Sequence, residues 1–278
     1  MTHATSDRLS EAHDALVEAV ESIATGEDWA RMLDTASRFH RYSANNVFLI
    51  MLQRPEATRV AGYRTWQSLG RQVRKGEHGI RILAPCKYRH TGLDAETGQE
   101  IIYAGIRGFT TTTVFDVSQT DGNELPDVTP TLLDGEGVAG LWDALAAQVK
   151  LQGYTLERGD CYGANGTTDH SVRTVRVRHD LGDAQATKTL CHELAHVLLH
   201  PDTATYLQCR GRSEVEAESV AFLVCHAAGL TTDGYSFPYV ARWADGDPDL
   251  VRSTAERVLK AARAVVASLE SEELEAVA

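Results

Sequence analysis

Long apolar runs are absent from this 278-residue sequence, cysteine is scarce, and the first residues contain no hydrophobic leader. No apolar stretch approaches the roughly 20 residues of a membrane-spanning helix, so we expect no membrane partner. The polar, acidic start is unlike a secretory signal. The five cysteines are odd in number, scattered and without a C-x-x-C pair. They predict reduced thiols in the cytoplasm instead of a disulfide framework.

Acidic residues outnumber basic ones, and the formal net charge of −12 disfavours a nucleic-acid partner for the chain as a whole. The charge is unevenly distributed, however. Residues 31–90, here called the basic region, contain twelve basic and three acidic side chains, a balance of +9. Residues 1–30 and 91–278 have balances of −6 and −15. A basic region between two acidic ones indicates a polyanionic partner.

Two patterns of apolar residues divide the chain. Helical periodicity over 7–24 and from Asp28 onward is followed by segments rich in β-branched and aromatic residues, which predict strands. Residues 120–137 contain two prolines and several acids, as a linker does, and the chain beyond them reads as mainly helical. We therefore expect an α+β protein of two domains: helices with an antiparallel sheet (1–122), a linker (123–137), and a mainly helical domain with a small sheet (138–278).

The segment CHELAHVLLH (191–200) contains the spacing His-Glu-x-x-His. In an α-helix, His192 and His196 lie one turn apart on the same face, so that both imidazoles can reach one metal ion. Glu193 then lies beside that ion, where it can deprotonate a metal-activated water. The alternative interpretation is two histidines on a helix surface without a ligand.

A catalytic zinc ion usually takes three protein ligands, and the sequence offers two candidates for the third. His200 lies eight residues after His192, about 12 Å along a helix axis, which is too far for one ion. We expect His200 behind the ligands or at the helix C-terminus. The other candidate is Glu214, which shares a helix stripe with Glu218 and two alanines. We expect Glu214 to bind the metal, Glu218 to accept a hydrogen bond from a ligating histidine, and Glu216 to point away into solvent.

His192-Glu193-x-x-His196 followed by Glu214-x-x-Ala217-Glu218 resembles zinc peptidases of the gluzincin type, and HELAHVLLH with EVEAESVA resembles the ImmA/IrrE family of intracellular metallopeptidases. The resemblance implies a zincin-like domain over 136–278 that hydrolyses peptide bonds with Zn²⁺, although Glu218 stands where that family often has Asn. On ligand types alone, Mn²⁺ remains an alternative metal. Four residues are candidates for stabilising the oxyanion: Tyr162, His170, His200 and Tyr206.

Cations and aromatic side chains are interleaved over residues 41–85. Cations follow a phosphate backbone, and aromatic faces stack on unpaired bases. The alternative is a solvated basic surface over core aromatics. The candidate DNA-binding residues are Arg41, Asn45, Asn46, Arg64, Trp66, Arg71, Arg74, Lys75 and Arg81.

The order of residues in SANN…LIMLQRPEATRVAGYRTWQSLGRQVRKGEHGIRILAP, with TVFDVSQT further on, resembles the N-terminal domain of ArdC-type antirestriction proteins. The resemblance spans residues 8–122 and implies binding of single-stranded DNA by a domain joined to a metallopeptidase-like domain. We therefore expect an antirestriction protein of a mobile element or phage that cleaves a protein substrate near single-stranded DNA. The alternatives are a protein that coats single-stranded DNA without proteolysis, and a peptidase that cleaves a transcriptional repressor.

Overall fold

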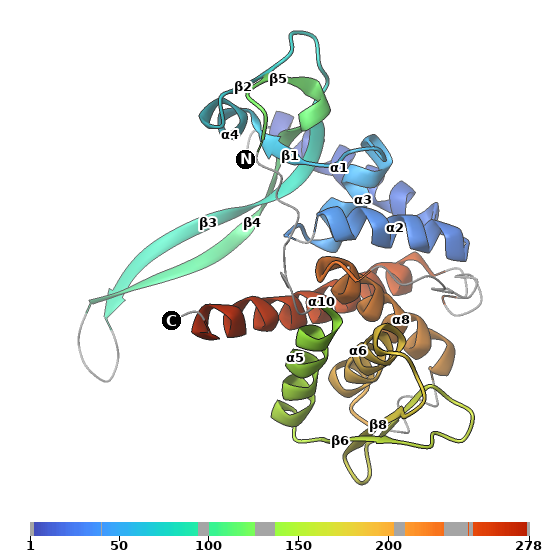
Figure 1. Ribbon diagram of the computed structural model, residues 1–278. Helices are drawn as coiled ribbons and strands as arrows, with labels where there is room; N and C mark the ends of the chain where they lie inside the picture. The colour runs from blue at the N-terminus through green and yellow to red at the C-terminus, as the bar shows by residue number, and fades with distance from the viewer. Residues whose placement is uncertain are drawn as a thin grey trace. The chain divides into compact units, whose positions relative to one another are not determined.

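The computed structural model describes residues 3–39, 41–93, 100–125, 137–202, 209–230, 244 and 247–276 (Figure 1). Helices and small sheets are combined, which confirms the α+β class. The chain forms two compact units, Met1–Ala19 with Asn45–Leu125, and Val20–Ala44 with Pro126–Ala278. No helix among the described residues is long and apolar enough to cross a membrane.

Helix α2 (Gly26–Arg38) belongs to the second unit although it lies early in the sequence. It begins with a capping box between Thr25 and Asp28, and its apolar face is buried. The Trp29 Nε1–H donates to Ser219 Oγ at 2.8 Å, which anchors α2 to α8 (Arg210–Ala227). The two compact units therefore do not correspond to a division of the chain at residue 122, because residues 20–44 belong to the second unit. The boundaries 1–122, 123–137 and 138–278 remain predictions about functional domains, and residues 126–136 of the linker lie outside the described residues.

The first unit is built around a long antiparallel ribbon of β3 (Ile80–Leu93) and β4 (Glu100–Asp116), drawn in cyan to green in Figure 1. Short β1 (Val60–Gly62) pairs with the end of β4 only. The face of the ribbon that carries Ile80, Ile82 and Val114 is buried at this end. The other elements of this unit are α1 (His3–Glu21, up to Ala19), α3 (Ala44–Gln53, from Asn45), α4 (Tyr63–Ser68), the 3₁₀ turn η1 (Val117–Gln119), and β2 (Arg71–Val73) paired with β5 (Thr120–Gly122).

Asp116 joins β4 to the loop before β1. Its Oδ2 accepts the backbone N–H groups of Thr58 and Arg59 at 2.8 and 3.0 Å, and its Oδ1 accepts that of Ser118 at 2.9 Å. Burial alone raises the pKa of Asp116, but the hydrogen bonds to its carboxylate outweigh burial and hold the pKa below its ordinary value. Ionised Asp116 therefore stabilises this loop.

We expect Asp116→Asn to lower the free energy of unfolding by roughly 2 kcal/mol at pH 7, because an amide cannot accept all of these charge-assisted hydrogen bonds. Since the folded-state pKa is lowered, this contribution is present above the unfolded value of about 3.9. It disappears as the pH falls through the folded-state pKa. Urea unfolding of both proteins from neutral to acid pH measures the difference. A difference that stays constant down to acid pH would contradict this role for the carboxylate.

The second unit places a three-stranded sheet beside a group of helices. In the sheet, β6 (Thr155–Gly159) pairs in parallel with β8 (Thr174–Arg178), and β7 (Gly166–Asp169) pairs antiparallel with β8 at the sheet edge. The central helix is α6 (Asp183–Leu199), which packs against α8, β7 and β8. The described helices of this unit also include α5 (Gly137–Leu151) and α10 (Pro248–Ala276).

Candidate metal centre

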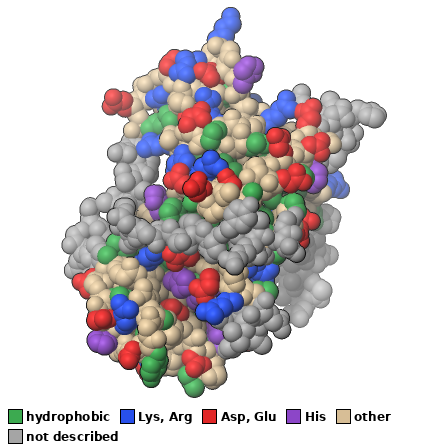
Figure 2. Space-filling view, turned by 90° about the vertical axis from the view of Figure 1, so that its right-hand side faces the viewer, with side chains coloured by type: hydrophobic (Ala, Val, Ile, Leu, Met, Phe, Trp, Pro, Cys, Tyr) green, Lys and Arg blue, Asp and Glu red, His purple; other side chains and the backbone are tan. Residues whose placement is uncertain are grey.

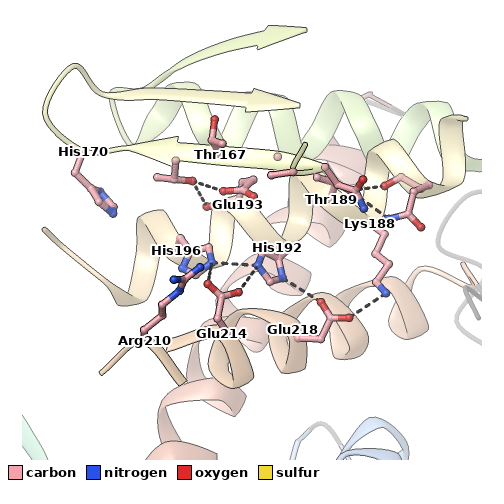
Figure 3. Close-up of a pocket in the computed structure, with 15 residues that line it drawn as sticks. Thr167, His170, Lys188, Thr189, His192, Glu193, His196, Arg210, Glu214 and Glu218 are labelled. Carbon is pink, nitrogen blue, oxygen red and sulfur yellow. Dashed lines mark hydrogen bonds and ion pairs between the residues drawn. The ribbon is translucent and has the colours of Figure 1, made fainter. Parts of the chain in front are cut away.

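Helix α6 presents the His-Glu-x-x-His segment to a cavity between α8 and the sheet edge (Figure 3). Its apolar positions Leu190, Leu194 and Ala195 are buried in the core. This packing turns the side chains of His192, Glu193 and His196 away from the core and toward the cavity, which has a volume of about 700 Å³. The helix was expected from its periodicity, and the structure places the motif in its second half.

The side chains of His192, His196 and Glu214 converge in this cavity. The two Nε2 atoms of His192 and His196 are 3.1 Å apart, and Glu214 oxygens lie 3.4 Å from the first and 3.9 Å from the second. One ligand atom from each residue lies within 4.8 Å of the other two. Two imidazole nitrogens and a carboxylate oxygen suit a divalent cation such as zinc, and three protein ligands leave a fourth position for water or substrate. The residues therefore fit a metal ion.

His192 is oriented by a carboxylate and a lysine that lie behind it. Its Nδ1 lies 3.0 Å from Glu218 Oε2, and Lys188 Nζ lies 3.0 Å from Glu218 Oε1. Because a carboxylate only accepts hydrogen bonds, Nδ1 carries a proton. When the ring is neutral, as a metal ligand must be, the lone pair of Nε2 therefore faces the cavity. Glu218 thus has the contact expected from the sequence. Lys188 was missed, although its position four residues before His192 on α6 was a usable signal.

His196 is oriented by a buried His200–Glu216 pair. His196 Nδ1 lies 2.9 Å from His200 Nδ1, and His200 Nε2 lies 2.9 Å from Glu216 Oε2. Since Glu216 accepts from His200 Nε2–H, the Nδ1 of a neutral His200 accepts from His196 Nδ1–H. The Nε2 lone pair of His196 then faces the cavity, as in His192. Glu216 is 0% exposed, so the expectation that it points into solvent is wrong: Arg257 Nη2 at 3.4 Å compensates its buried charge, and His200 donates a hydrogen bond to it.

We expect His200→Phe to weaken metal binding about 10- to 100-fold, as loss of an orienting partner behind a ligand does. Phe fills a similar volume but cannot accept the His196 Nδ1–H, so the ring of His196 loses its fixed orientation. Competition with a fluorescent zinc chelator measures the affinity. His226→Phe, at the last turn of α8, is a matched control that leaves the centre unchanged. Equal affinities for wild type and His200→Phe would show that the pair does not orient His196.

The two histidines have opposite charge preferences. Burial lowers the pKa of His192, but the carboxylates of Glu214 and Glu218 more than compensate and raise it to about 10. Burial and the neighbouring His192 lower the pKa of His196 to about 3. Burial also raises the pKa of Glu193, partly offset by His192. The centre thus holds one positive charge between carboxylates, at the place that a bound cation would take.

Glu193 is held against β7 and does not belong to the three converging ligands. Its Oε2 accepts the Thr168 hydroxyl at 2.7 Å, and the carboxylate is buried. Gly166 lies so close that a Cβ at this position would be 2.6 Å from Glu193 Oε1. Both contacts come from the edge strand, and sequence reasoning missed them because neither residue belongs to a recognisable motif. Together they fix the carboxylate at the wall of the cavity (Figure 3).

The candidates for stabilising an oxyanion have different positions. His170 lines the cavity, and its Nδ1 lies 2.8 Å from the Tyr154 hydroxyl, which fixes the ring. His200 is buried behind His196 and does not line the cavity. Tyr162 is 88% exposed and also does not line it. Tyr206 lies outside the described residues. His170 is therefore the candidate that the described cavity contains.

Three of the candidate DNA-binding residues have structural roles in the first unit. The Asn46 side-chain amide donates to the Leu83 carbonyl at 2.9 Å and accepts from the Leu83 N–H at 2.8 Å. Trp66 is 2% exposed and donates its Nε1–H to the Phe115 carbonyl, so its face is not available to a base. The Arg71 guanidinium donates hydrogen bonds to the hydroxyl and the backbone carbonyl of Thr120. These three side chains hold the fold together.

Other candidates are paired with acids or exposed. Arg74 lies 2.8 Å from Glu77 and 3.3 Å from Asp121, and Arg81 pairs with Glu11. Asn45 is half-buried, whereas Arg64 and Lys75 are exposed, as is Arg41 in the second unit. On the face drawn in Figure 2, basic side chains are interspersed with acidic ones and do not form one continuous patch. The net charge of the basic region therefore does not identify a binding surface.

Comparison with known proteins identifies relatives of both the N-terminal part and the whole fold. Residues 6–115 match the family model of the N-terminal domain of anti-restriction factor ArdC. The uncharacterised Bacillus anthracis protein pXO2-81 is 25% identical over 81% of this chain, and the chain spans only 44% of that relative.

Two crystal structures of antirestriction ArdC protein from plasmid R388 are also similar. The metal-free one has 22% identity and a TM-score of 0.50, over 83% of this chain and 86% of that one. The Mn(II)-bound one has 21% identity and a TM-score of 0.48, over 86% and 97%. At 22% identity, the similarity to the metal-free structure shows a similar fold and nothing more. Residues 6–115 of this chain are thus similar to the N-terminal domain of anti-restriction factor ArdC.

Proposed function

We propose that the second unit is a metal-dependent peptidase. The observation that carries this proposal is the convergence of His192, His196 and Glu214 beside a buried Glu193 that is not needed as a ligand. Three ligands with an open position are typical of catalytic metal sites, whereas structural zinc sites are closed by four ligands. The ImmA/IrrE-like and gluzincin-type resemblance of the same segment agrees with this function.

The residues divide the chemical work between holding the cation and moving protons. His192, His196 and Glu214 would hold a divalent cation, which supplies Lewis acidity toward a carbonyl and a water molecule. Glu193 accepts a proton at its carboxylate and returns it to the leaving amine. Thr168 holds Glu193 Oε2 at 2.7 Å, so the carboxylate does not need to reorganise during the reaction. Zn²⁺ suits these ligands and Mn²⁺ is the alternative; elemental analysis of the purified protein would distinguish the two metals.

The edge of the sheet supports a peptide as the substrate. Strand β7 lines the cavity with Gly166, Thr167 and Thr168, and in the described sheet it pairs on one side only, with β8. An extended peptide can add to such an edge by main-chain hydrogen bonds. A chain bound in this way passes along the wall that holds Glu193.

We further propose that the first unit binds single-stranded DNA and brings the peptidase to a protein there, as part of an antirestriction function in the cytoplasm. The ArdC-type domain over 6–115 and the basic region support this partner. Tethering raises the effective concentration of a protein substrate on the same DNA. None of the five cysteines forms a disulfide, which suits a reducing compartment. A coating protein without proteolysis and a repressor-cleaving peptidase are the competing functions.

The proposed activity can be tested without knowing the natural substrate. Protein loaded with zinc or with manganese is incubated with a pool of peptides from a bacterial proteome, and new termini are identified by mass spectrometry. We expect cleavage that a chelator abolishes and that metal restores. A protein that carries about one metal ion per chain but never cleaves, while still binding single-stranded DNA, would favour the coating function.

A further inference from the structure

Exposed apolar side chains gather on the β3–β4 ribbon of the first unit. Tyr88, Ile106 and Phe109 are 47%, 58% and 50% exposed, and all three lie within the part of the ribbon that has only two strands. β1 pairs with β4 only at residues 114–116. Burying such side chains against a partner is favourable, and large apolar groups that cluster on a surface mark binding sites.

The exposed side chains lie on both faces of the ribbon. Phe109 pairs with Pro85 and Ile106 pairs with Lys87, with a β-bulge between the two pairs that places the extra residue on β4. Because Pro85 and Lys87 are two residues apart on β3, these four side chains share one face. Tyr88 pairs with Gly105 on the other face, and a Cβ at Gly105 would lie 2.7 Å from the Tyr88 ring. The tyrosine ring therefore lies across the ribbon.

Between its ends the ribbon has charge of one sign. Residues 80–93 and 101–115 contain no Asp or Glu, and their cations are Arg81, Lys87, Arg89 and Arg107. Lys87 and Arg107 flank the exposed aromatic rings and are themselves exposed. Three acidic residues occur between 94 and 100, which confines a polyanion to the middle of the ribbon.

We propose that a single strand of nucleic acid wraps around the middle of this ribbon, with bases stacked on Phe109 on one face and on Tyr88 on the other, and phosphates beside Lys87 and Arg107. This inference rests on the proposed binding of single-stranded DNA and assigns it a surface. Stacking needs exposed rings, and Trp66 in the basic region is buried. The ribbon offers exposed rings and basic side chains together, whereas Arg74 and Arg81 are paired with acids.

The test uses the full chain and a fluorescein-labelled oligothymidylate, with affinity measured by anisotropy at several salt concentrations. We expect each of Tyr88→Ala and Phe109→Ala to weaken binding about 5- to 150-fold, with no change in salt dependence. Tyr88→Trp and Phe109→Trp should keep the affinity, because they preserve stacking. The double variant Lys87→Ala/Arg107→Ala should reduce the slope of log affinity against log salt by about 1.4.

The matched control is Lys150→Ala/Lys260→Ala, which removes two exposed cations of the second unit and should change neither the affinity nor the salt slope. If wild type binds and the two aromatic-to-alanine variants bind equally well, the ribbon is not the site, although DNA binding itself stands. If wild type shows no binding at any salt concentration, the proposed DNA-binding function fails as well. Equal loss of duplex and single-strand binding in the alanine variants would also overturn the stacking model. Unfolding midpoints verify that each variant is folded.

Discussion

Glu193→Gln is expected to lower the rate of peptide hydrolysis at least about 100-fold, within the range that a general base contributes. The amide keeps the size of the side chain and can still bond Thr168, but it cannot accept a proton from water. Glu193 lies against β7 and outside the group His192, His196 and Glu214. The variant should therefore retain its metal. Initial rates with any peptide cleaved by the wild type, together with metal content, measure both effects.

Glu157→Gln is a matched control for this variant, because Glu157 is an exposed glutamate on β6 that pairs with Arg176. It should cleave at the wild-type rate. A Glu193→Gln protein that is metal-loaded and fully active would exclude Glu193 as the base. If the same variant still protects incoming DNA in cells, antirestriction does not need proteolysis, and the coating function is the better account.

Glu214→Ala is expected to reduce the metal content from about one ion per chain to near zero. Two histidines remain, but the carboxylate is the only negatively charged member of the group that the structure brings together. Because three protein ligands are the usual minimum for a catalytic zinc, two imidazoles do not hold the ion against buffer and chelator. Elemental analysis after dialysis measures the ratio of metal to protein.

Glu256→Ala on α10 makes the same change at an exposed helical position and should keep its metal. Full retention of metal by Glu214→Ala would exclude Glu214 as the third ligand. His200 and Glu218 would then need testing, although His200 contacts His196 from behind and Glu218 contacts the Nδ1 of His192. Absence of metal from the wild type even after resupply would remove the basis of the peptidase proposal.

Local helix geometry explains how much of the centre could be predicted. The relative positions of His192, Glu193 and His196 depend on the geometry of one helical turn, and the sequence pattern is enough to predict that helix. The same periodicity placed Glu214 and Glu218 on one side of a second helix. Their contacts with His192 then required only that the two helices pack together, which small residues between the carboxylates allow.

The contacts behind and above the centre could not be predicted in this way. Glu216 follows Glu214 by two residues, so helical geometry turns it to another side, but whether that side meets water or protein depends on His200 and Arg257. Thr168 belongs to a strand 25 residues before Glu193, and nothing in its neighbourhood marks it as a partner of a catalytic residue. Such contacts arise only when distant elements pack.

The first unit shows the same division. The sequence by itself determined that residues 31–90 are basic and that helices precede a ribbon of strands, because charge and periodicity are properties of the chain. Only the tertiary structure decided which side chains remain outside. Trp66 is buried whereas Tyr88 and Phe109 are exposed, although nothing in the residues around these three aromatic side chains distinguishes them. Exposure depends on which elements cover a residue, and that is set by packing between segments far apart in the chain.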